Sequence, residues 1–299
     1  MKLRAVDLFS GCGGMSLGFN QAGIDIVAAY DNWEPALSIY SSNFAHHAYR
    51  KDLNDPDAPD VIRSHMPDVL IGGPPCQDYS IAGKQRPGAR ANLTIRFGEI
   101  VALVQPQWVV FENVYTVQRY HTLDLLKEIL SRAGYGLSAA VLDASYCGVP
   151  QKRKRYFLVG KLGEVDGFFD AWFNRGQSDH PVTVRDYVGE SFNTDYYYMH
   201  PRSYNRRAVF SMDEPAATIR GINRPIPSTY KKHPGDPVDI DDGVRALTTR
   251  ERATIQTFPA SFKLLGPKTD VELAIGNAVP PALARFLAHN MIAYETDRR

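Results

Sequence analysis

The sequence is poor in cysteine, and its three cysteines (Cys12, Cys76 and Cys147) are widely spaced and form no CxxC pair. An odd number without such a pair argues against a disulfide framework and against a zinc site, so we expect no metal. The sequence also lacks any run of about 18 apolar residues, and its first residues, MKLRAVDLFSG, enter a strand-like pattern without the features of a signal peptide. We therefore expect a cytoplasmic protein that makes no use of a membrane.

There is little excess charge either, since the formal net charge is only +1, but the charges are unevenly distributed. Residues 151–161 (QKRKRYFLVGK) carry five Lys/Arg and no acid, and residues 200–233 carry seven Lys/Arg against two acids. A local basic face is what a polyanion contacts, so a balanced total does not exclude nucleic acid. A solvated surface remains the alternative for either segment.

Short apolar runs alternate with helical patterns over the first 162 residues. Six runs are typical of buried strands, at residues 3–9, 24–30, 68–73, 108–114, 137–144 and 155–161. Helices are expected at about 15–22, after an Asn32 cap with Pro35 in the first turn, and at about 94–104 and 122–133. The alternation predicts an α/β fold: a mostly parallel twisted sheet with helices on both faces, which binds ligands beyond the carboxyl ends of its strands.

The pattern changes after residue 162. From 163 to 242 the periodicity is weak, Pro and Gly are scattered, and a tyrosine cluster at Tyr196–Tyr198 is the expected core. Regular patterns return near Arg245 and end in an apolar helix that we expect to pack against the first part. The predicted organisation is a large domain over 1–162, a smaller irregular or β domain over 163–242, and a return to the large domain over 243–299.

A glycine-rich turn, DLFSGCGGMSLGF, follows the first strand, and its glycines let the backbone approach a ligand. Ser16 stands where the dinucleotide fingerprint GxGxxG has its third glycine, which disfavours a nucleotide-dependent oxidoreductase and indicates a nucleoside-type cofactor without a pyrophosphate. Asp31 ends the second strand, where a carboxylate can accept the two hydroxyls of a ribose, and Asp52 could end the third. A tight connection without a ligand is the alternative for the turn alone.

Cys76 lies in GGPPCQDYS, just beyond the apolar run at 68–73, and this placement is hard to explain as packing. A long segment without helical or strand pattern follows it, and such segments in compact domains are usually lids or disordered. The segment carries Lys84, Arg86 and Arg90, which suit a cover over a phosphate backbone. An inert thiol is the alternative for Cys76 by itself.

Glu112 ends the strand at 108–114, at the sheet edge where Cys76 is expected. Burial at the end of a hydrophobic strand raises the pKa of a carboxyl group, so that it can donate a proton near neutrality. A thiol beside such a group suits attack on an electron-poor ring that is protonated as it accepts the nucleophile. A structural carboxylate that caps a helix is the alternative.

Five segments in this order resemble the signature motifs of the DNA (cytosine-5) methyltransferases: DLFSGCGGMSLGF, GGPPCQDYS, FENV, QKRKRYF and IGNAVPPA. The resemblance extends over nearly the whole chain and is that of a bacterial restriction-modification enzyme. It implies the S-adenosylmethionine-dependent methyltransferase fold, with a catalytic and cofactor-binding domain over 1–162 and a target recognition domain over 163–242.

The resemblance further implies S-adenosylmethionine as cofactor and double-stranded DNA as substrate. The residues it implies for the cofactor are Asp7, Phe9, Gly11, Gly13, Asp31, Asn32, Asp52, Pro75, Asn277 and Ala278. In the family mechanism the Cys76 thiolate adds to carbon 6 of a flipped-out cytosine and Glu112 protonates ring nitrogen 3. Arg155 would bind the ring carbonyl, and Arg153 would support the loop or a phosphate, so both are counted with the catalytic residues.

DNA contacts are expected from the segment after Cys76 and from the second domain. The candidates are Ser80, Lys84, Arg86, Arg90, Arg220 and Arg224. The last two belong to TIRGINRPIP, residues 218–227, which is expected to form a rigid recognition loop. Cys12 and Cys147 match no catalytic position and are expected to be structural.

Two positions depart from the family pattern. Asp31 is followed by Asn32 and Trp33 instead of a large hydrophobic neighbour, so Trp33 is a substitute for stacking on adenine, and Asp78 stands where proline is common. An RNA methyltransferase and a catalytically inactive nucleic-acid-binding relative stay as alternatives, although the retained Cys76 and Glu112 argue against the latter. A cognate restriction endonuclease and a monomeric state are expected as well.

Overall fold

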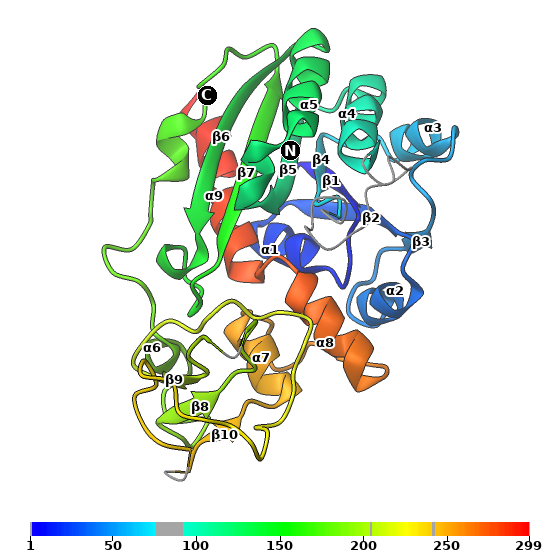
Figure 1. The fold of residues 1–299 in the computed structure, drawn as a ribbon. Helices are drawn as coiled ribbons and strands as arrows, with labels where there is room; N and C mark the ends of the chain where they lie inside the picture. The colour runs from blue at the N-terminus through cyan, green and yellow to red at the C-terminus, as the bar shows by residue number, and fades with distance from the viewer. Residues whose placement is uncertain (1, 76–91, 204, 241–242, 299) are drawn as a thin grey trace.

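The computed structural model describes residues 2–75, 92–203, 205–240 and 243–298, which form a large α/β unit with a smaller unit beside it (Figure 1). The large unit contains a seven-stranded sheet in the order β3-β2-β1-β4-β5-β7-β6. Its strands are β1 (Arg4–Leu8), β2 (Asp25–Asp31), β3 (Ala48–Arg50), β4 (Val69–Gly72), β5 (Trp108–Val114), β6 (Tyr135–Asp143) and β7 (Lys154–Leu162). Neighbouring strands pair in parallel except β7, which is antiparallel to both β5 and β6. The six predicted strands and the mostly parallel sheet are confirmed.

Helices cover both faces of this sheet, because alternate residues of its strands are apolar and buried on opposite sides. Ile71 packs in a cluster with Phe19 and Leu283, whereas Leu70 packs in a cluster with Phe97 and Leu126. The first face is covered by α1 (Gly14–Ala22) and α9 (Pro281–Asp297), and the second by α3 (Ala58–Ser64), α4 (Asn92–Val104) and α5 (His121–Arg132). The C-terminal helix α9 thus packs in the core of the large unit.

Two predicted helix ends are correct and one predicted helix start is wrong. Gly23 ends α1 with φ 102°, and Gly134 follows α5 with φ 92°, both in the left-handed region that favours glycine. Asn32 is not the cap of α2 (Glu34–Ser41), because Trp33 occupies that position. The Trp33 amide donates to Asp31 Oδ1 at 2.8 Å, so the carboxylate at the end of β2 holds the chain extended for one residue longer than predicted.

The smaller unit contains a three-stranded sheet in the order β10-β8-β9 and short helices around it. Its elements are α6 (Val184–Val188), β8 (Tyr196–Tyr198), β9 (Val209–Ser211), β10 (Arg245–Ala246), α7 (Thr249–Ile255) and α8 (Lys268–Asn277). Tyr197 and Tyr198 are 0% and 1% exposed, so the tyrosine cluster contributes to the core of this unit as predicted. Phe169 and Phe173 pack in the core of the large unit.

The two units share a hydrophobic cluster at their junction. It contains Ile39 of α2, Tyr197 of β8, Ile219, and Ile275 of α8. Figure 1 shows α8, in orange, between the smaller unit and the large sheet. The start of β7 lies against the carboxyl end of β5, and just before it Gln151 forms a β-bridge with Ala216 of the smaller unit. The carboxyl edge of β5 therefore lies close to the point where the smaller unit is attached.

Candidate active site

The loop between β1 and α1 brings backbone amides close to the carboxyl edge of the sheet. Phe9 and Gly11 have φ of 60° and 53°, and Gly13 has φ 91°, so the chain turns sharply three times within five residues. Gly14 is needed for packing, since a Cβ there would lie 2.1 Å from the carbonyl oxygen of Val279. The turn that precedes α9 is thus in direct contact with the glycine-rich loop.

Asp31 is held rigidly at the end of β2. Its Oδ2 accepts the Gly11 amide and its Oδ1 accepts the Trp33 amide, both at 2.8 Å. Burial raises the pKa of Asp31, while these amide hydrogen bonds lower it in part. Each carboxylate oxygen keeps a second lone pair, so the fixed carboxylate can still accept two hydroxyl groups.

Asp7 lies behind the same loop and is only 1% exposed. Ser16 Oγ donates to Asp7 Oδ2 at 2.6 Å, and Tyr40 Oη donates to Ser16 Oγ at 2.7 Å. Burial raises the pKa of Asp7 to about 7 despite the Ser16 hydrogen bond. This carboxyl group therefore supports the loop from the inside, and its placement at the end of β1 agrees with the sequence while its burial was not foreseen.

The other predicted cofactor residues lie around this loop with different exposure. Phe9 is partly exposed, and Asn32, Asp52, Pro75 and Asn277 are exposed, with Ala278 half-buried beside Asn277. One further polar atom was missed: Ser10 Oγ is buried and has no hydrogen-bond partner among the described residues. A buried hydroxyl without a partner is costly, so it is a candidate for a ligand contact. Its signal in the sequence was only its place between Phe9 and Gly11.

Glu112 and Arg155 form an ion pair at the carboxyl end of β5. Arg155 Nε lies 3.0 Å from Glu112 Oε1, and the two side chains are 14% and 10% exposed. The register explains the contact, because Arg155 is paired with Val114 and is therefore a diagonal neighbour of Glu112 across the antiparallel pair. Burial raises the pKa of Glu112, as predicted, and the Arg155 and Arg153 charges offset part of that rise.

The segment that leads to Cys76 begins against this ion pair. A Cβ at Gly73 would lie 2.9 Å from Glu112 Oε2, so only glycine leaves room for the carboxylate there. Asn113 Nδ2 donates to the Pro74 carbonyl oxygen at 3.0 Å. Cys76 itself lies outside the described residues, as do Ser80, Lys84, Arg86 and Arg90. The structure thus fixes the chain as far as Pro75, next to Glu112.

Arg153 and Gln151 are both 0% exposed and contact backbone rather than solvent. The Arg153 guanidinium donates to the carbonyl oxygens of Ile219, Gly276 and Ala278 at 2.9 to 3.1 Å. Gln151 Oε1 accepts the Ile219 amide at 2.9 Å. These contacts join the start of β7 to the smaller unit and to the turn after α8, and the burial leaves no path from Arg153 to a phosphate through the described residues.

The basic residues of the smaller unit differ in exposure. Arg202, Arg206, Arg224, Lys231 and Lys232 are exposed. Arg220 is half-buried, donates to the His200 carbonyl oxygen, and has its pKa lowered by burial and by Arg202 and Arg206. Of the two predicted readers, Arg224 is therefore the one that projects into solvent.

A model of the C-5 cytosine-specific DNA methylase family matches residues 3–293. The match covers nearly the whole chain and every element described above except the last four residues of α9. The chain belongs to this family. It is a DNA (cytosine-5) methyltransferase, as the order of its motifs predicted.

Two curated relatives are similar over almost their full length. One is the Type II methyltransferase M.HindV of Haemophilus influenzae, 51% identical over 99% of this chain and 98% of the relative. The other is the Type II methyltransferase M.HgiDI of Herpetosiphon aurantiacus, 52% identical over 98% of this chain and 95% of the relative.

Solved structures support the fold at much lower identity. A putative DNA modification methyltransferase encoded within a prophage of E. coli has a TM-score of 0.74 at 20% identity and covers 99% of this chain and 100% of its own. The S. pombe Dnmt2 methyltransferase has the same TM-score at 18% identity, with the same coverage. The predicted methyltransferase fold with a second, smaller unit is confirmed.

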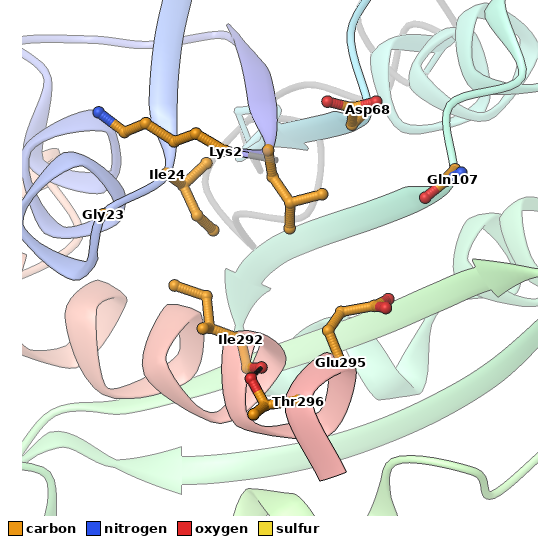
Figure 2. Close-up of a pocket in the computed structure, with 9 residues that line it drawn as sticks. Lys2, Gly23, Ile24, Asp68, Gln107, Ile292, Glu295 and Thr296 are labelled. Carbon is orange, nitrogen blue, oxygen red and sulfur yellow. Dashed lines mark hydrogen bonds between the residues drawn. The ribbon is translucent and has the colours of Figure 1, made fainter. Parts of the chain in front are cut away.

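A cavity in the described part of the methyltransferase lies at the edge of the sheet opposite to the predicted site (Figure 2). Its volume is about 460 Å³, and Leu3, Ile24, Asp68 and Gln107 line it, each of which directly precedes a strand. Figure 2 shows Ile292 and Glu295 of α9 on its other side, and Glu295 Oε1 already accepts hydrogen bonds from neighbouring residues. The amino ends of the strands carry none of the predicted site residues.

Among the described residues no group of three or more His, Cys, Asp or Glu side chains is placed to hold a metal ion. None of the helices in the described ranges is long and apolar enough to cross a membrane. Cys12 and Cys147 are buried free thiols, 1% and 5% exposed, which fits the structural role predicted for them.

Proposed function

We propose that the enzyme transfers the methyl group of S-adenosylmethionine to carbon 5 of a specific cytosine in double-stranded DNA, through a covalent adduct of Cys76 with a flipped-out base. The observation that carries this proposal is the Glu112–Arg155 ion pair, 3.0 Å apart and largely buried, against which the segment leading to Cys76 begins. The pair supplies a proton donor and a fixed cation beside Gly73, three residues before Cys76 in the sequence.

The residues on and around the β1–α1 loop fit the cofactor. Asp31 offers two fixed carboxylate oxygens for the hydroxyls of a ribose, and the buried Ser10 hydroxyl offers a polar contact without another partner among the described residues. Phe9, Trp33 and the turn at Asn277 and Ala278 would enclose the remainder, with Asp7 holding the loop from behind. When bound, the cofactor supplies an electrophilic methyl group on a positively charged sulfur.

The chain's own residues would perform the rest of the reaction. The Cys76 thiolate forms a bond to carbon 6 of the cytosine while the Glu112 carboxyl group gives its proton to nitrogen 3, which makes carbon 5 nucleophilic. Carbon 5 takes the methyl group. A base then removes the proton from carbon 5, nitrogen 3 returns its proton to the Glu112 carboxylate, and the thiolate leaves as the aromatic ring is restored. Arg155 would hold the ring carbonyl at position 2.

Glu112 can serve as the proton donor because burial raises its pKa more than the neighbouring arginines lower it. Arg155 then has two roles that its position allows: it orients the carboxyl group and presents a guanidinium to the base. We assign Arg153 a positioning role, since its guanidinium contacts three carbonyl oxygens and not a ligand surface.

DNA would be bound by the smaller unit and by Lys84, Arg86 and Arg90, which lie outside the described residues. Arg224 and the other exposed cations of the smaller unit are suited to phosphate or guanine contacts. Since the two curated relatives are Type II methyltransferases, we also propose a cognate restriction endonuclease that acts on the same site. A monomeric state and a cytoplasmic location remain predictions from the sequence.

The test of the covalent mechanism is the substitution Cys76→Ala, with Cys147→Ala as a control at a buried thiol. The protein and S-adenosylmethionine are incubated with random-sequence duplex DNA, and 5-methylcytosine is mapped at base resolution. We expect one preferred sequence for the parent enzyme and for Cys147→Ala, and no methylation by Cys76→Ala, which should still bind DNA. Methylation by Cys76→Ala would overturn the proposed mechanism.

A second measurement separates DNA from RNA and reports the adduct directly. Duplex DNA that contains 5-fluorocytosine should trap the protein covalently, because fluorine at carbon 5 prevents the elimination step. A structured RNA with the same base should not. Trapping on RNA alone would favour the RNA methyltransferase alternative, and no adduct on either would remove the thiol as nucleophile.

A further inference from the structure

The root of the 218–227 loop is held by side chains from distant parts of the chain. Gln151 and Arg153 bind the amide and the carbonyl oxygen of Ile219, at 2.9 and 3.0 Å. Arg252 of α7 donates to the carbonyl oxygen of Arg220. The loop is therefore fixed at two consecutive residues before it reaches its exposed part.

A third anchor comes from α8. Glu272 is 2% exposed, and its Oε1 accepts Asn223 Nδ2 at 2.8 Å and Thr249 Oγ1 at 2.7 Å. The same Asn223 amide donates to the Leu247 carbonyl oxygen at 3.0 Å. Asn223 is the residue directly before Arg224, so the last fixed point of the loop adjoins the exposed arginine.

Glycines bring the loop backbone against α8 between these anchors. A Cβ at Gly221 would lie 2.6 Å from Leu273 Cδ1, and a Cβ at Gly276 would lie 2.2 Å from the Gly221 backbone nitrogen. Contact this close leaves the loop root no room to shift toward the helix. The position of Asn223 is thus determined by sterics as well as by hydrogen bonds.

The buried ion pair behind Asn223, formed by Arg252 and Glu272, fixes the position of the segments that it joins more than it stabilises the fold. Arg252 Nη1 lies 2.8 Å from Glu272 Oε2, and both side chains are 3% exposed. Arg252 Nε has no hydrogen-bond acceptor among the described residues. A buried ion pair with incomplete hydrogen bonding is a poor source of folding free energy, but such a pair can fix the register of the parts that it joins.

We infer that Asn223 is a positioning residue. The buried Arg252–Glu272 pair holds the side-chain amide of Asn223, and Asn223 in turn sets the direction in which Arg224 meets the DNA. This direction determines the sequence discrimination of the enzyme. This inference rests on the proposed function, in which the 218–227 loop contacts DNA. The inference goes beyond the proposed function because it assigns a role in sequence specificity to Asn223, whose side chain need not touch the DNA.

The experiment measures discrimination, defined as the ratio of methylation rates at the preferred site and at sites that differ from it by one base pair. The preferred site is taken from the random-sequence map of the parent enzyme. Arg224→Ala removes the proposed reader and should lower discrimination at one position by about tenfold or more, the size of one lost base contact. Asn223→Ala should lower discrimination at the same position to a similar degree.

Two further variants separate positioning from general damage. Asn223→Asp keeps the size of the side chain but faces Glu272 with a second carboxylate, so it should lower discrimination as much as Asn223→Ala does. Asn290→Ala in α9 removes a comparable amide, which donates to the Arg175 carbonyl oxygen at 3.1 Å in the large unit, and should leave discrimination unchanged. All assays are run well below the measured melting temperature of each variant, and KM for S-adenosylmethionine is recorded in parallel.

The outcomes distinguish a failure of the proposed DNA-reading loop from a failure of the inference about Asn223. If Arg224→Ala leaves discrimination unchanged, the assignment of the loop as a DNA reader is wrong, and the inference is overturned with it. If Arg224→Ala lowers discrimination and Asn223→Ala and Asn223→Asp do not, only the inference is overturned. Equal loss in Asn290→Ala, or a loss confined to KM for S-adenosylmethionine, would also overturn it. Since Glu272 keeps Arg252 and Thr249 as partners in Asn223→Ala, this half-buried position should tolerate the change.

Discussion

The strand-end cluster and the 218–227 loop are positioned in different ways. Asp7, Asp31 and Glu112 lie in or at the end of the strands that carry them, so a few neighbouring residues set the place of each. The loop is instead held by side chains that are 32 to 68 positions away in the sequence. One region takes its geometry from the regular sheet and the other from buried polar contacts between distant segments.

This difference predicts how each region responds to substitution. A substitution at a strand end should remove one chemical group and leave the seven-stranded sheet in place, because strand pairing and burial on both faces of the sheet hold the strand. A change among the buried anchors of the loop should disturb several segments together, because each anchor joins at least two of them. Three substitutions, in order of expected effect, test whether the contrast holds.

The largest effect is expected for Glu112→Gln. Gln keeps the shape of the side chain but cannot give a proton to the base, so the rate of methyl transfer should fall by roughly 100- to 10,000-fold, the usual contribution of general acid catalysis. DNA affinity and melting temperature should change little. Single-turnover methylation rates and DNA titrations measure the two quantities.

Glu128→Gln is the matched control, since Glu128 lies half-exposed on α5 with Arg132 as its partner. Its rate should stay within about twofold of the parent enzyme, as expected for an exposed pair. A rate for Glu112→Gln within tenfold of the parent enzyme would show that the proton comes from elsewhere. A large drop in melting temperature would show that the Glu112 side chain also stabilises the sheet.

The same difference explains how far the sequence could be interpreted. Strand ends follow from apolar runs and turn residues, so β1, β2, β4 and β5 were predicted closely, and the burial that raises the pKa of Glu112 followed from its place in one of them. The reversed direction of β7 and the burial of Arg153 did not follow, because both depend on pairing with distant segments. The Asn32 cap failed for a local reason, the competing hydrogen bond from Trp33 to Asp31.

The loop region raises a further difficulty for prediction. Arg252 and Glu272 look like surface residues in the sequence, since each lies in a polar stretch of α7 or α8, and yet both are buried. Their pairing across two helices has no signal in spacing or periodicity. Arg220 and Arg224 were equivalent candidates in the sequence, and they are separated by the burial of Arg220 and its contact with His200.

The second largest effect is expected for Arg252→Met. The substitution leaves the Glu272 carboxylate buried without its cation, which should lower the free energy of unfolding by about 3 to 5 kcal/mol. The double variant Arg252→Met with Glu272→Met removes both charges and should recover most of that loss. Urea denaturation of the parent enzyme, both single variants and the double variant gives the coupling free energy.

Lys232→Met is the control within the same unit, because Lys232 and Asp239 form an exposed ion pair at 3.0 Å, with side chains 46% and 62% exposed. It should cost less than about 1 kcal/mol. If Arg252→Met costs no more than Lys232→Met, the buried pair does not hold the smaller unit in place. If the double variant loses as much free energy of unfolding as the two single variants together, the two charges act independently. The proposed difference between the two regions would then be wrong.

The smallest effect is expected for Asp7→Asn, and it appears as a change in pH dependence. Burial raises the pKa of Asp7 to about 7 in the folded protein, well above the value of an unfolded aspartate. The folded state therefore holds a proton that the unfolded state has lost, so this group's contribution to stability is complete below about pH 4 and declines as the pH rises toward 7. The decline is at most about 1.4 kcal/mol per pH unit. Asp7→Asn removes it, so the stability of the variant relative to the parent enzyme should increase between pH 5 and pH 7.

Urea denaturation of both proteins at pH 5, 6 and 7 measures this difference without cofactor or DNA, and any effect of the substitution that does not depend on pH cancels in the slope. Ser16→Ala provides a comparison of opposite sense, because the Ser16 hydrogen bond lowers the pKa of Asp7 and its loss should extend the decline to higher pH. Equal slopes for Asp7→Asn and the parent enzyme would mean that Asp7 is charged throughout this range. In that case the strand end would bury a carboxylate at little cost, and the strand-end cluster would depend, like the 218–227 loop, on the polar partners around it.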